Sequence, residues 1–189
     1  MKIFHHKTLS IFMGIIVILT VILGCILYTS KYVLTTISYR LQTTRLIPSL
    51  RILQLSDLHN SEFGTHNSRL ISAVRAQSPD LILLTGDLLN SDEQRTDIAT
   101  ELITQLCDIA PVYCSNGNHE VEYQEKYGVD VDELYREAGA VVLEKDYRDI
   151  TVKNQQIRLG GIYGYCLPGK YLETGEADLE ETVFLEEFQ

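Results

Sequence analysis

The sequence lacks the features that mark several classes of protein. Its four cysteines form no CxxC pair and no zinc-ligand spacing, so nothing indicates a disulfide framework. No internal repeat and no low-complexity tract occurs, and the proportions of hydrophobic (45%) and charged (22%) residues are ordinary for a globular protein. The net charge of -10 argues against holding nucleic acid through a broad basic surface.

Acidic residues are missing from the first part of the 189-residue chain. Residues 1–50 contain five Lys or Arg and no Asp or Glu, whereas residues 51–189 contain the other 11 bases and all 26 acids. The second part therefore carries a net charge of -15. Two pieces of different physical character meet near residue 50.

The first piece contains an uncharged, apolar run of 18 residues from Ile11 to Tyr28. As a helix with a rise of about 1.5 Å per residue it would be roughly 27 Å long, close to the ~30 Å core of a bilayer. Helix is favoured in lipid despite the many β-branched residues, because every backbone polar group must be paired within the segment. We therefore predict a short basic head over residues 1–10 and a transmembrane signal anchor over residues 11–30.

Two alternatives to an uncleaved anchor remain open. A cleaved signal peptide would have a shorter apolar run followed by a small-residue cleavage site. The second alternative is a lipoprotein, since Ile22–Cys25 loosely resembles a lipobox, the motif at which lipoproteins are processed. Basic residues flank the run on both sides, so the positive-inside rule hardly decides the orientation. Because the head is short and the acidic part has few bases near the span, we expect a single-pass protein with the globular part on the extracytoplasmic side.

The second piece alternates strands and helices. A linker and first strand are expected over residues 31–50, with the strand at Val33–Gln42 ahead of Pro48. Three apolar strands and two helices with one apolar stripe follow in alternation: Arg51–Ser56, Asn67–Gln77, Leu81–Thr85, Asp92–Ala110 and Pro111–Ser115. This β-α-β-α-β order implies a parallel sheet with right-handed crossovers, so the predicted fold class is α/β.

Further elements are expected along residues 131–188. They are a helix at Val131–Ala138, a strand at Ala140–Leu143, a hairpin of Ile150–Lys153 and Gln156–Ile162, and an acidic helix at Asp178–Phe188. Residues 51–189 are thus predicted to form one domain.

Polar residues follow each of the three predicted parallel strands, Arg51–Ser56, Leu81–Thr85 and Pro111–Ser115, at the point where the strand ends. They are Asp57-Leu58-His59-Asn60, Gly86-Asp87 and Asn116-Gly117-Asn118-His119-Glu120. Open α/β sheets bind ligands at the carboxyl ends of their strands. Because Asp57 and His59 are two residues apart, we expect both to project to the same side of an extended strand end. One carboxylate and one imidazole could then hold a single cation.

Two glycines are expected to bring the other motifs to the same crevice. Gly86 would turn the backbone so that Asp87 faces it, and Gly117 would do so for the two residues that follow. Each motif alone has a structural explanation, since an Asp after a strand often caps a helix and Asn-Gly often forms a turn. Three such motifs, in order and each at a strand end, indicate a metal site.

These motifs resemble the first three motifs of the calcineurin-like metallophosphoesterases. The flanking sequences SDLHN and LLTGDLLN are most similar to the bacterial membrane-associated YkuE- and YaeI-like branch. The resemblance covers about residues 33–189 and implies a binuclear metal centre on a β-sandwich flanked by helices. It also implies roles for five residues: Asp57 and His59 ligate the first metal, Asp87 bridges both metals, Asn118 ligates the second, and His119 contacts the phosphate and protonates the leaving oxygen.

The implied chemistry agrees with these residue types. Two cations about 3.5–4 Å apart clamp phosphoryl oxygens and generate hydroxide from bound water. Mixed oxygen and nitrogen ligands suit two divalent ions such as Mn, Fe or Zn. An imidazole with a pKa of about 6.5 can donate a proton at neutral pH. We expect a membrane-anchored phosphoesterase acting on a phosphoester or pyrophosphate, with the membrane and a phosphorylated small molecule or lipid-like substrate as partners and no stable nucleic-acid binding.

The chain departs from the family pattern after its third motif. The family has a later His and a Gly-His-x-His motif, which complete both metal shells. This chain has five histidines, and none of them follows His119. We therefore expect residues 51–189 to hold the N-terminal half of a truncated metallophosphoesterase domain. The alternative function is a non-catalytic remnant that lacks the C-terminal histidine ligands.

Overall fold

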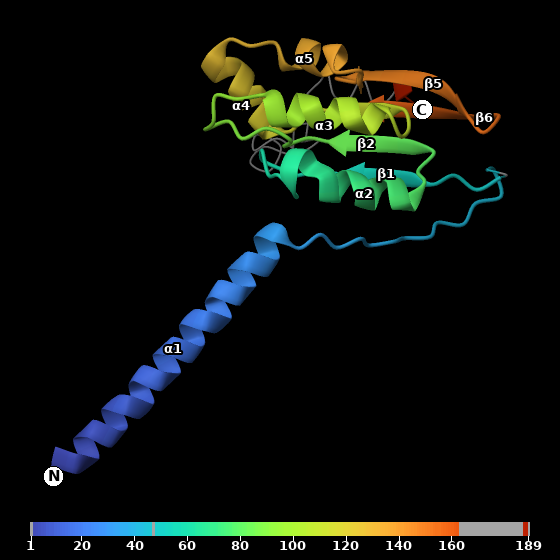
Figure 1. Ribbon diagram of the computed structural model, residues 1–189. Helices are drawn as coiled ribbons and strands as arrows, with labels where there is room; N and C mark the ends of the chain where they lie inside the picture. The colour runs from blue at the N-terminus through green and yellow to red at the C-terminus, as the bar shows by residue number, and fades with distance from the viewer. Residues whose placement is uncertain (1, 47, 163–186, 189) are drawn as a thin grey trace, which may run out of the picture. The chain divides into compact units, whose positions relative to one another are not determined.

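The computed structural model describes residues 2–46, 48–162 and 187–188. The chain divides into two compact units, Met1–Arg40 and Leu41–Gln189 (Figure 1). The acidic helix predicted at Asp178–Phe188 lies outside the described residues except for its last two.

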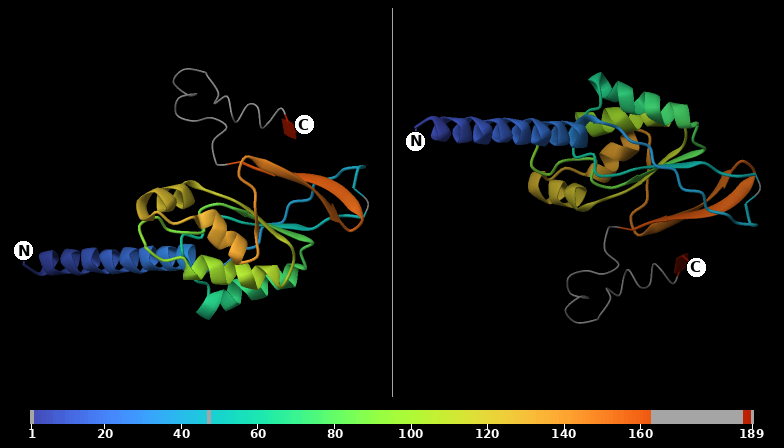
Figure 2. Two further views of the ribbon diagram at one scale, coloured as in Figure 1. Left: turned by 90° about the horizontal axis from the view of Figure 1, so that it is seen from above. Right: turned by 90° about the horizontal axis from the view of Figure 1, so that it is seen from below.

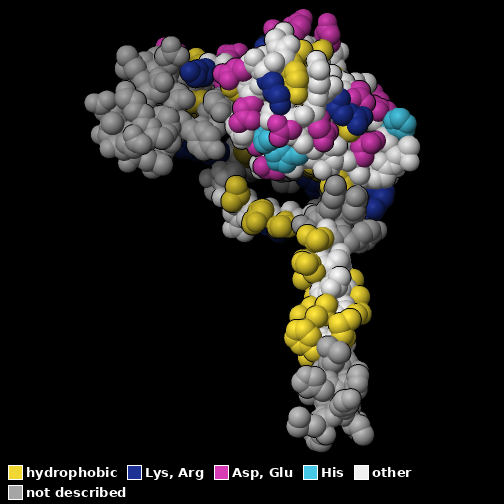
Figure 3. Space-filling model, turned by 90° about the vertical axis from the view of Figure 1, so that its left-hand side faces the viewer, with side chains coloured by type: hydrophobic (Ala, Val, Ile, Leu, Met, Phe, Trp, Pro, Cys, Tyr) yellow, Lys and Arg dark blue, Asp and Glu magenta, His cyan; other side chains and the backbone are white. Residues whose placement is uncertain are grey.

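The first unit is built around one long helix, α1, from Lys2 to Tyr32. From Phe12 to Leu27 all of its side chains are exposed, and Figure 3 shows hydrophobic side chains along this stretch. Among the described residues, however, no helix is both long and apolar enough to cross a membrane. The predicted transmembrane anchor over residues 11–30 is therefore not confirmed.

The strand predicted at Val33–Gln42 is wrong. These residues form neither helix nor strand. A β-branched sequence becomes a strand only when a neighbouring strand supplies a hydrogen-bonding ladder, and the sequence pattern cannot show whether that neighbour exists.

The second unit contains a four-stranded parallel sheet with the strands in chain order. Its strands are β1 (Ile52–Leu55), β2 (Leu81–Thr85), β3 (Val112–Ser115) and β4 (Val141–Val142). β2 pairs with a strand on each side, and Leu81, Ile82 and Leu84 are almost fully buried. This burial explains the continuous apolar run that predicted the strand. The α/β class with a parallel sheet and helices is confirmed.

Helices connect successive strands and cover the sheet. They are α2 (Ser68–Gln77), α3 (Asp97–Cys107), α4 (Asn118–Tyr127) and α5 (Val131–Glu137), with a 3-10 turn, η1 (Thr65–Asn67), before α2. Figure 2 shows α2 and α3 side by side on one side of the sheet. The apolar stripe of α3 packs inward through Leu102, Ile103 and Leu106, as predicted. This helix starts at Asp97 rather than Asp92, because residues 91–96 form a loop.

The sequence did not predict α4. Its sequence, NHEVEYQEKY, has no apolar stripe, and only Glu120 and Tyr123 are buried. Periodicity therefore gives no signal for this helix. Its first residues nevertheless carry the third polar motif.

A two-stranded antiparallel sheet follows, formed by β5 (Asp146–Val152) and β6 (Gln155–Gly161). The predicted hairpin is confirmed, but its turn lies one residue earlier than predicted, at Lys153-Asn154 instead of Asn154-Gln155. Both turn residues have left-handed backbones, as tight hairpin turns require. Figure 2 shows this hairpin on the side of the main sheet away from α2 and α3. The complete β-sandwich stays a prediction.

Candidate metal centre

Asp57 and His59 lie just beyond the end of β1, but not on an extended strand. Their φ angles are +56° and +45°, so the predicted extended strand end is wrong. The backbone here leaves the extended strand conformation and pairs with the loop at Gly86 and Asp87. The N–H of Asp57 donates to the carbonyl of Gly86 (3.2 Å), and the N–H of His59 donates to that of Asp87 (2.9 Å).

Asp87 has a left-handed backbone as well, with φ +55°. Left-handed residues other than glycine are uncommon, and three of them here carry side chains suited to a metal. Such strain persists only where the surrounding hydrogen bonds impose it, and it concentrates at functional sites.

The side chains of Asp57, His59 and Asp87 converge. Each offers one ligand atom, and these atoms all lie within 4.8 Å of one another. The Ser56 hydroxyl donates to the Asp57 carboxylate (2.5 Å), and the backbone N–H of His119 donates to Asp87 Oδ1 (3.0 Å). Within the described part of the chain, no ion pair compensates either carboxylate. Two close carboxylates beside an imidazole form a donor set that fits a divalent cation, whose bonds to such ligands are about 2.0–2.2 Å.

Two glycines allow the second and third motifs to approach each other. Gly86 has φ +87°, as the predicted sharp turn requires, and a Cβ there would lie 2.6 Å from the Cα of Gly117. Gly117 has φ -101°, so it does not turn the backbone as predicted. A Cβ on Gly117 would instead lie 2.7 Å from Cγ of Asp87. Gly117 is needed because the two loops touch.

Asn118 and His119 are the first two residues of α4. Asn118 lines a cavity of about 370 Å³ together with Asp57 and Asp87. The ring of His119 lies 4.5 Å from that of His59, centroid to centroid, in an edge-to-face arrangement. The structure thus brings the five predicted residues to one edge of the sheet, while their individual roles stay predictions.

Glu120 is a residue whose importance the sequence did not reveal. Its side chain is 0% exposed, yet its carboxylate accepts five hydrogen bonds. The donors are the N–H groups of Asp87 (2.7 Å), Leu88 (2.8 Å), Leu89 (3.1 Å) and Gly117 (2.9 Å), and the hydroxyl of Tyr135 (3.0 Å). A buried carboxylate is tolerated only with such complete pairing. Its position three residues after Gly117, typical of a capping glutamate, was the available signal.

The Tyr135 hydroxyl remains a donor in this arrangement. Burial, reinforced by the charge of Glu120 and the hydrogen bond to it, raises the pKa of Tyr135 well above its ordinary value. The phenol therefore stays protonated near neutral pH. Glu120 and Tyr135 together fix the loop that carries Asp87.

Comparison with known proteins identifies this arrangement. Residues 50–187 match the family model of the calcineurin-like phosphoesterases. The chain belongs to this family. This phosphoesterase chain is similar to the uncharacterized metallophosphoesterase YkoQ of Bacillus subtilis, with 27% identity over 118 residues, covering 61% of this chain and 44% of the relative.

A second relative is a component of the nuclease SbcCD of Staphylococcus saprophyticus. It is 26% identical over 106 residues, covering 53% of the phosphoesterase chain and 26% of the relative. The chain therefore spans less than half the length of either relative. Neither comparison tests the predicted YkuE- and YaeI-like branch. Phosphoesterases of this family use divalent metals, and Asp57, His59 and Asp87 form a candidate site for one.

Proposed function

We propose that the chain contributes to a metal-dependent phosphoesterase that hydrolyses a phosphoester or pyrophosphate. The convergence of Asp57, His59 and Asp87, with both carboxylates lacking a cationic partner among the described residues, carries this proposal. The family membership supports the reaction class. Hydrolysis of a phosphate ester needs a cation to neutralise the phosphoryl oxygens, and this cluster is a place to hold one.

The proposed mechanism uses two divalent ions. Such ions supply Lewis-acid activation of the phosphoryl group and of an attacking water. Asp57 and His59 would hold one ion, and Asp87, whose ligand atom lies within 4.8 Å of theirs, would contact both. Asn118 lines the same cavity and offers a neutral carbonyl oxygen, which limits the excess of negative charge. His119, adjoining this cluster, would donate the proton that the leaving oxygen needs.

The test is hydrolysis of p-nitrophenyl phosphate, bis(p-nitrophenyl) phosphate and pyrophosphate by the full-length protein with added Mn²⁺. Asp87→Ala should abolish turnover, because it removes the group proposed to contact both ions. Asp108→Ala, a matched change at an exposed position after α3, should leave the rate unchanged. If the metal-loaded protein hydrolyses none of the three substrates, the enzyme proposal fails and the non-catalytic alternative stands.

We also propose that the first unit anchors the protein in a membrane, with the phosphoesterase domain outside and a membrane-associated YkuE- or YaeI-like ancestry. The apolar side chains that α1 exposes, such as Phe12 and Leu27 at 61% each, support this proposal. A contiguous exposed apolar surface of this kind is unfavourable in water. A phosphorylated lipid or cell-envelope component would then be within reach as substrate.

Carbonate extraction tests the anchor. The protein should stay in the membrane pellet, and a variant without residues 1–30 should be released. Release of the unaltered protein would show that it is not anchored. Protease added to intact cells should cleave the phosphoesterase domain, and protection of the domain would contradict the proposed orientation.

A further inference from the structure

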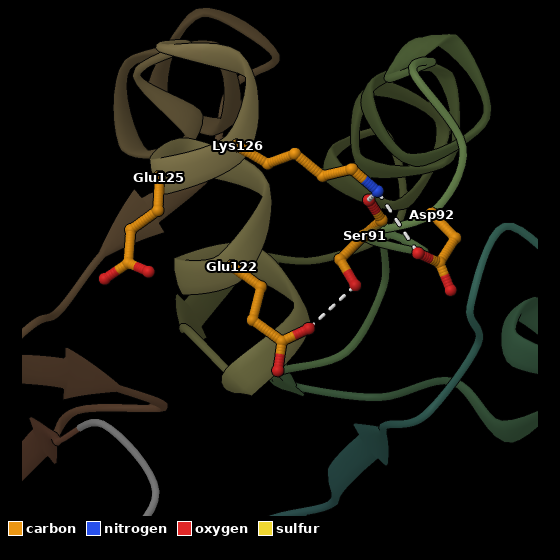
Figure 4. A pocket seen from close by; sticks show the side chains of 5 residues that line it. All are labelled: Ser91, Asp92, Glu122, Glu125 and Lys126. Atoms are coloured by element: carbon orange, nitrogen blue, oxygen red, sulfur yellow. Dashed lines mark hydrogen bonds and ion pairs between the residues drawn. The ribbon is translucent and has the colours of Figure 1, made fainter.

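A pocket of about 370 Å³ lies beside the candidate metal centre and takes no part in the function proposed above. It is lined by Ser91, Asp92, Glu122, Glu125 and Lys126 (Figure 4). Glu122, Glu125 and Lys126 come from α4, and the other two come from the loop after β2. Figure 4 shows the carboxylate of Glu122 directed at the Ser91 hydroxyl, whereas that of Glu125 lies apart from it.

Ser91 contacts His119 through two of its atoms. Its backbone N–H donates to Nδ1 of His119 (3.1 Å), and its hydroxyl oxygen lies 3.0 Å from the same nitrogen. Because a backbone N–H can only donate, it meets Nδ1 as an acceptor in the neutral ring, whose proton is on Nε2. The imidazolium form, which has a proton to give to a leaving oxygen, also carries a proton on Nδ1 and donates it to the Ser91 hydroxyl oxygen, whose own proton goes to Glu122. Nε2 makes no hydrogen bond to the described residues. It is therefore the nitrogen left to meet a substrate.

Glu122 contacts both Ser91 and Asn118. Its Oε2 accepts from the Ser91 hydroxyl (2.8 Å), and its Oε1 accepts a longer hydrogen bond from the amide nitrogen of Asn118 (3.4 Å). These hydrogen bonds, with that from Ser91 the stronger, hold the pKa of Glu122 below its ordinary value. With its amide nitrogen engaged by Glu122, Asn118 keeps its carbonyl oxygen for the metal cavity.

Lys126 ties the Ser91 loop to the same helix. Its ammonium group donates to the carbonyl of Ser91 (3.1 Å) and to the carboxylate of Asp92 (3.2 Å). Two residues of α4, about 30 positions later in the chain, thus hold Ser91: Glu122 accepts from its hydroxyl, and Lys126 donates to its carbonyl. The position of its hydroxyl is set by α4 rather than by its own loop.

We propose that Glu122 is a positioning residue that acts on both functional groups at the start of α4. Through Ser91 it fixes the His119 ring with Nε2 towards the substrate. Through the amide of Asn118 it orients the carbonyl oxygen that serves as a metal ligand. The inference rests on the proposed function for the roles of His119 and Asn118. Its metal-binding consequence can be measured without turnover.

The first experiment measures Mn²⁺ binding to the full-length protein by titration calorimetry. Glu122→Ala should weaken binding by about 10–100-fold, the usual effect of removing a partner that orients a metal ligand. Glu125→Ala is the matched control, since it removes a carboxylate from the same helix and the same pocket that lies apart from Ser91. Equal affinities for the two variants would overturn the link between Glu122 and Asn118, and so would the absence of Mn²⁺ binding in the unaltered protein.

The second experiment measures how the rate depends on the leaving group. Ser91→Ala should slow hydrolysis of phenyl phosphate by about 10-fold or more, and that of p-nitrophenyl phosphate much less, because a good leaving group needs no proton. The effects of Ser91→Ala and Glu122→Ala on phenyl phosphate should not be additive, since both act through one hydrogen-bonded chain. Equal losses on both substrates, as a merely structural role would give, would overturn the link to His119.

The two experiments also separate this inference from the proposed function. If Glu122→Ala weakens Mn²⁺ binding while the unaltered protein hydrolyses no phosphoester, the proposed function fails and the role of Glu122 at the metal site stands. If the unaltered protein is active and both Ser91→Ala and Glu122→Ala behave like the control Glu125→Ala, the proposed function stands and this inference fails.

Discussion

Glu120→Gln is expected to destabilise the candidate metal centre, although it only replaces one carboxylate oxygen with an NH₂ group. The carboxylate accepts hydrogen bonds from Leu88, Leu89 and Tyr135 at Oε1, and from Asp87 and Gly117 at Oε2. An amide offers one carbonyl oxygen as acceptor, and its NH₂ group can only donate. Whichever way the amide is oriented, at least two of the five donors would face another donor.

The magnitude follows from the number of stranded donors. A fully buried donor without an acceptor costs about 1–3 kcal/mol, so two part-buried donors cost at most about 2–6 kcal/mol. A domain of this size has a free energy of unfolding of about 5–15 kcal/mol, so the variant would lose a large fraction of it. The orientation that strands fewest donors leaves the N–H groups of Asp87 and Gly117 unpaired, so we expect Mn²⁺ affinity to fall as well.

Urea denaturation followed by circular dichroism measures the first effect, and calorimetric titration with Mn²⁺ measures the second. Glu137→Gln serves as the control, because it removes the same charge from an exposed position on α5 and should change stability by less than about 0.5 kcal/mol. If Glu120→Gln is as stable as this control and binds Mn²⁺ equally well, the reasoning from the five hydrogen bonds is refuted.

Three further predictions concern the centre and the hairpin. His119→Ala should slow hydrolysis of a substrate with a poor leaving group by about 10²–10⁴-fold and leave Mn²⁺ affinity nearly unchanged, and an equal loss on p-nitrophenyl phosphate would argue against a general acid. Gly117→Ala should reduce Mn²⁺ affinity, because the added Cβ would lie 2.7 Å from Cγ of Asp87 and push that carboxylate aside; unchanged affinity in titration calorimetry would show that the loops can separate. Asp80→Asn should lower stability at pH 7 and by less at pH 2, because the hydrogen bond from Lys153 (2.7 Å), with a further one from the backbone of Arg51 (2.8 Å), holds the pKa of Asp80 below its usual 3.8. That stabilisation is present above the unfolded-state pKa and is lost as the pH falls through the folded value, so urea midpoints that differ equally at both pH values would contradict it.

Local pattern was a reliable guide where a segment is buried by its neighbours on both sides. The run Leu81–Thr85 predicted a strand because a central strand must be apolar on both faces, and the structure places it between β1 and β3. The pattern misled where structure depends on a partner or on polar contacts. Val33–Gln42 has the composition of a strand, but among the described residues no neighbouring strand pairs with it. The helix α4 has no apolar stripe, and one of its buried residues is a glutamate.

The sequence by itself determined the α/β class, the three polar motifs and their location at strand ends. Each of these depends on residues that are neighbours in the chain, so spacing and composition are sufficient to predict them. Only the tertiary structure decided the left-handed backbones of Asp57, His59 and Asp87, the burial of Glu120 beneath the Asp87 loop, and the contact of Ser91 with His119. Those features arise from hydrogen bonds between segments about 30 residues apart, and one-dimensional pattern carries no information about which distant donor will meet which acceptor.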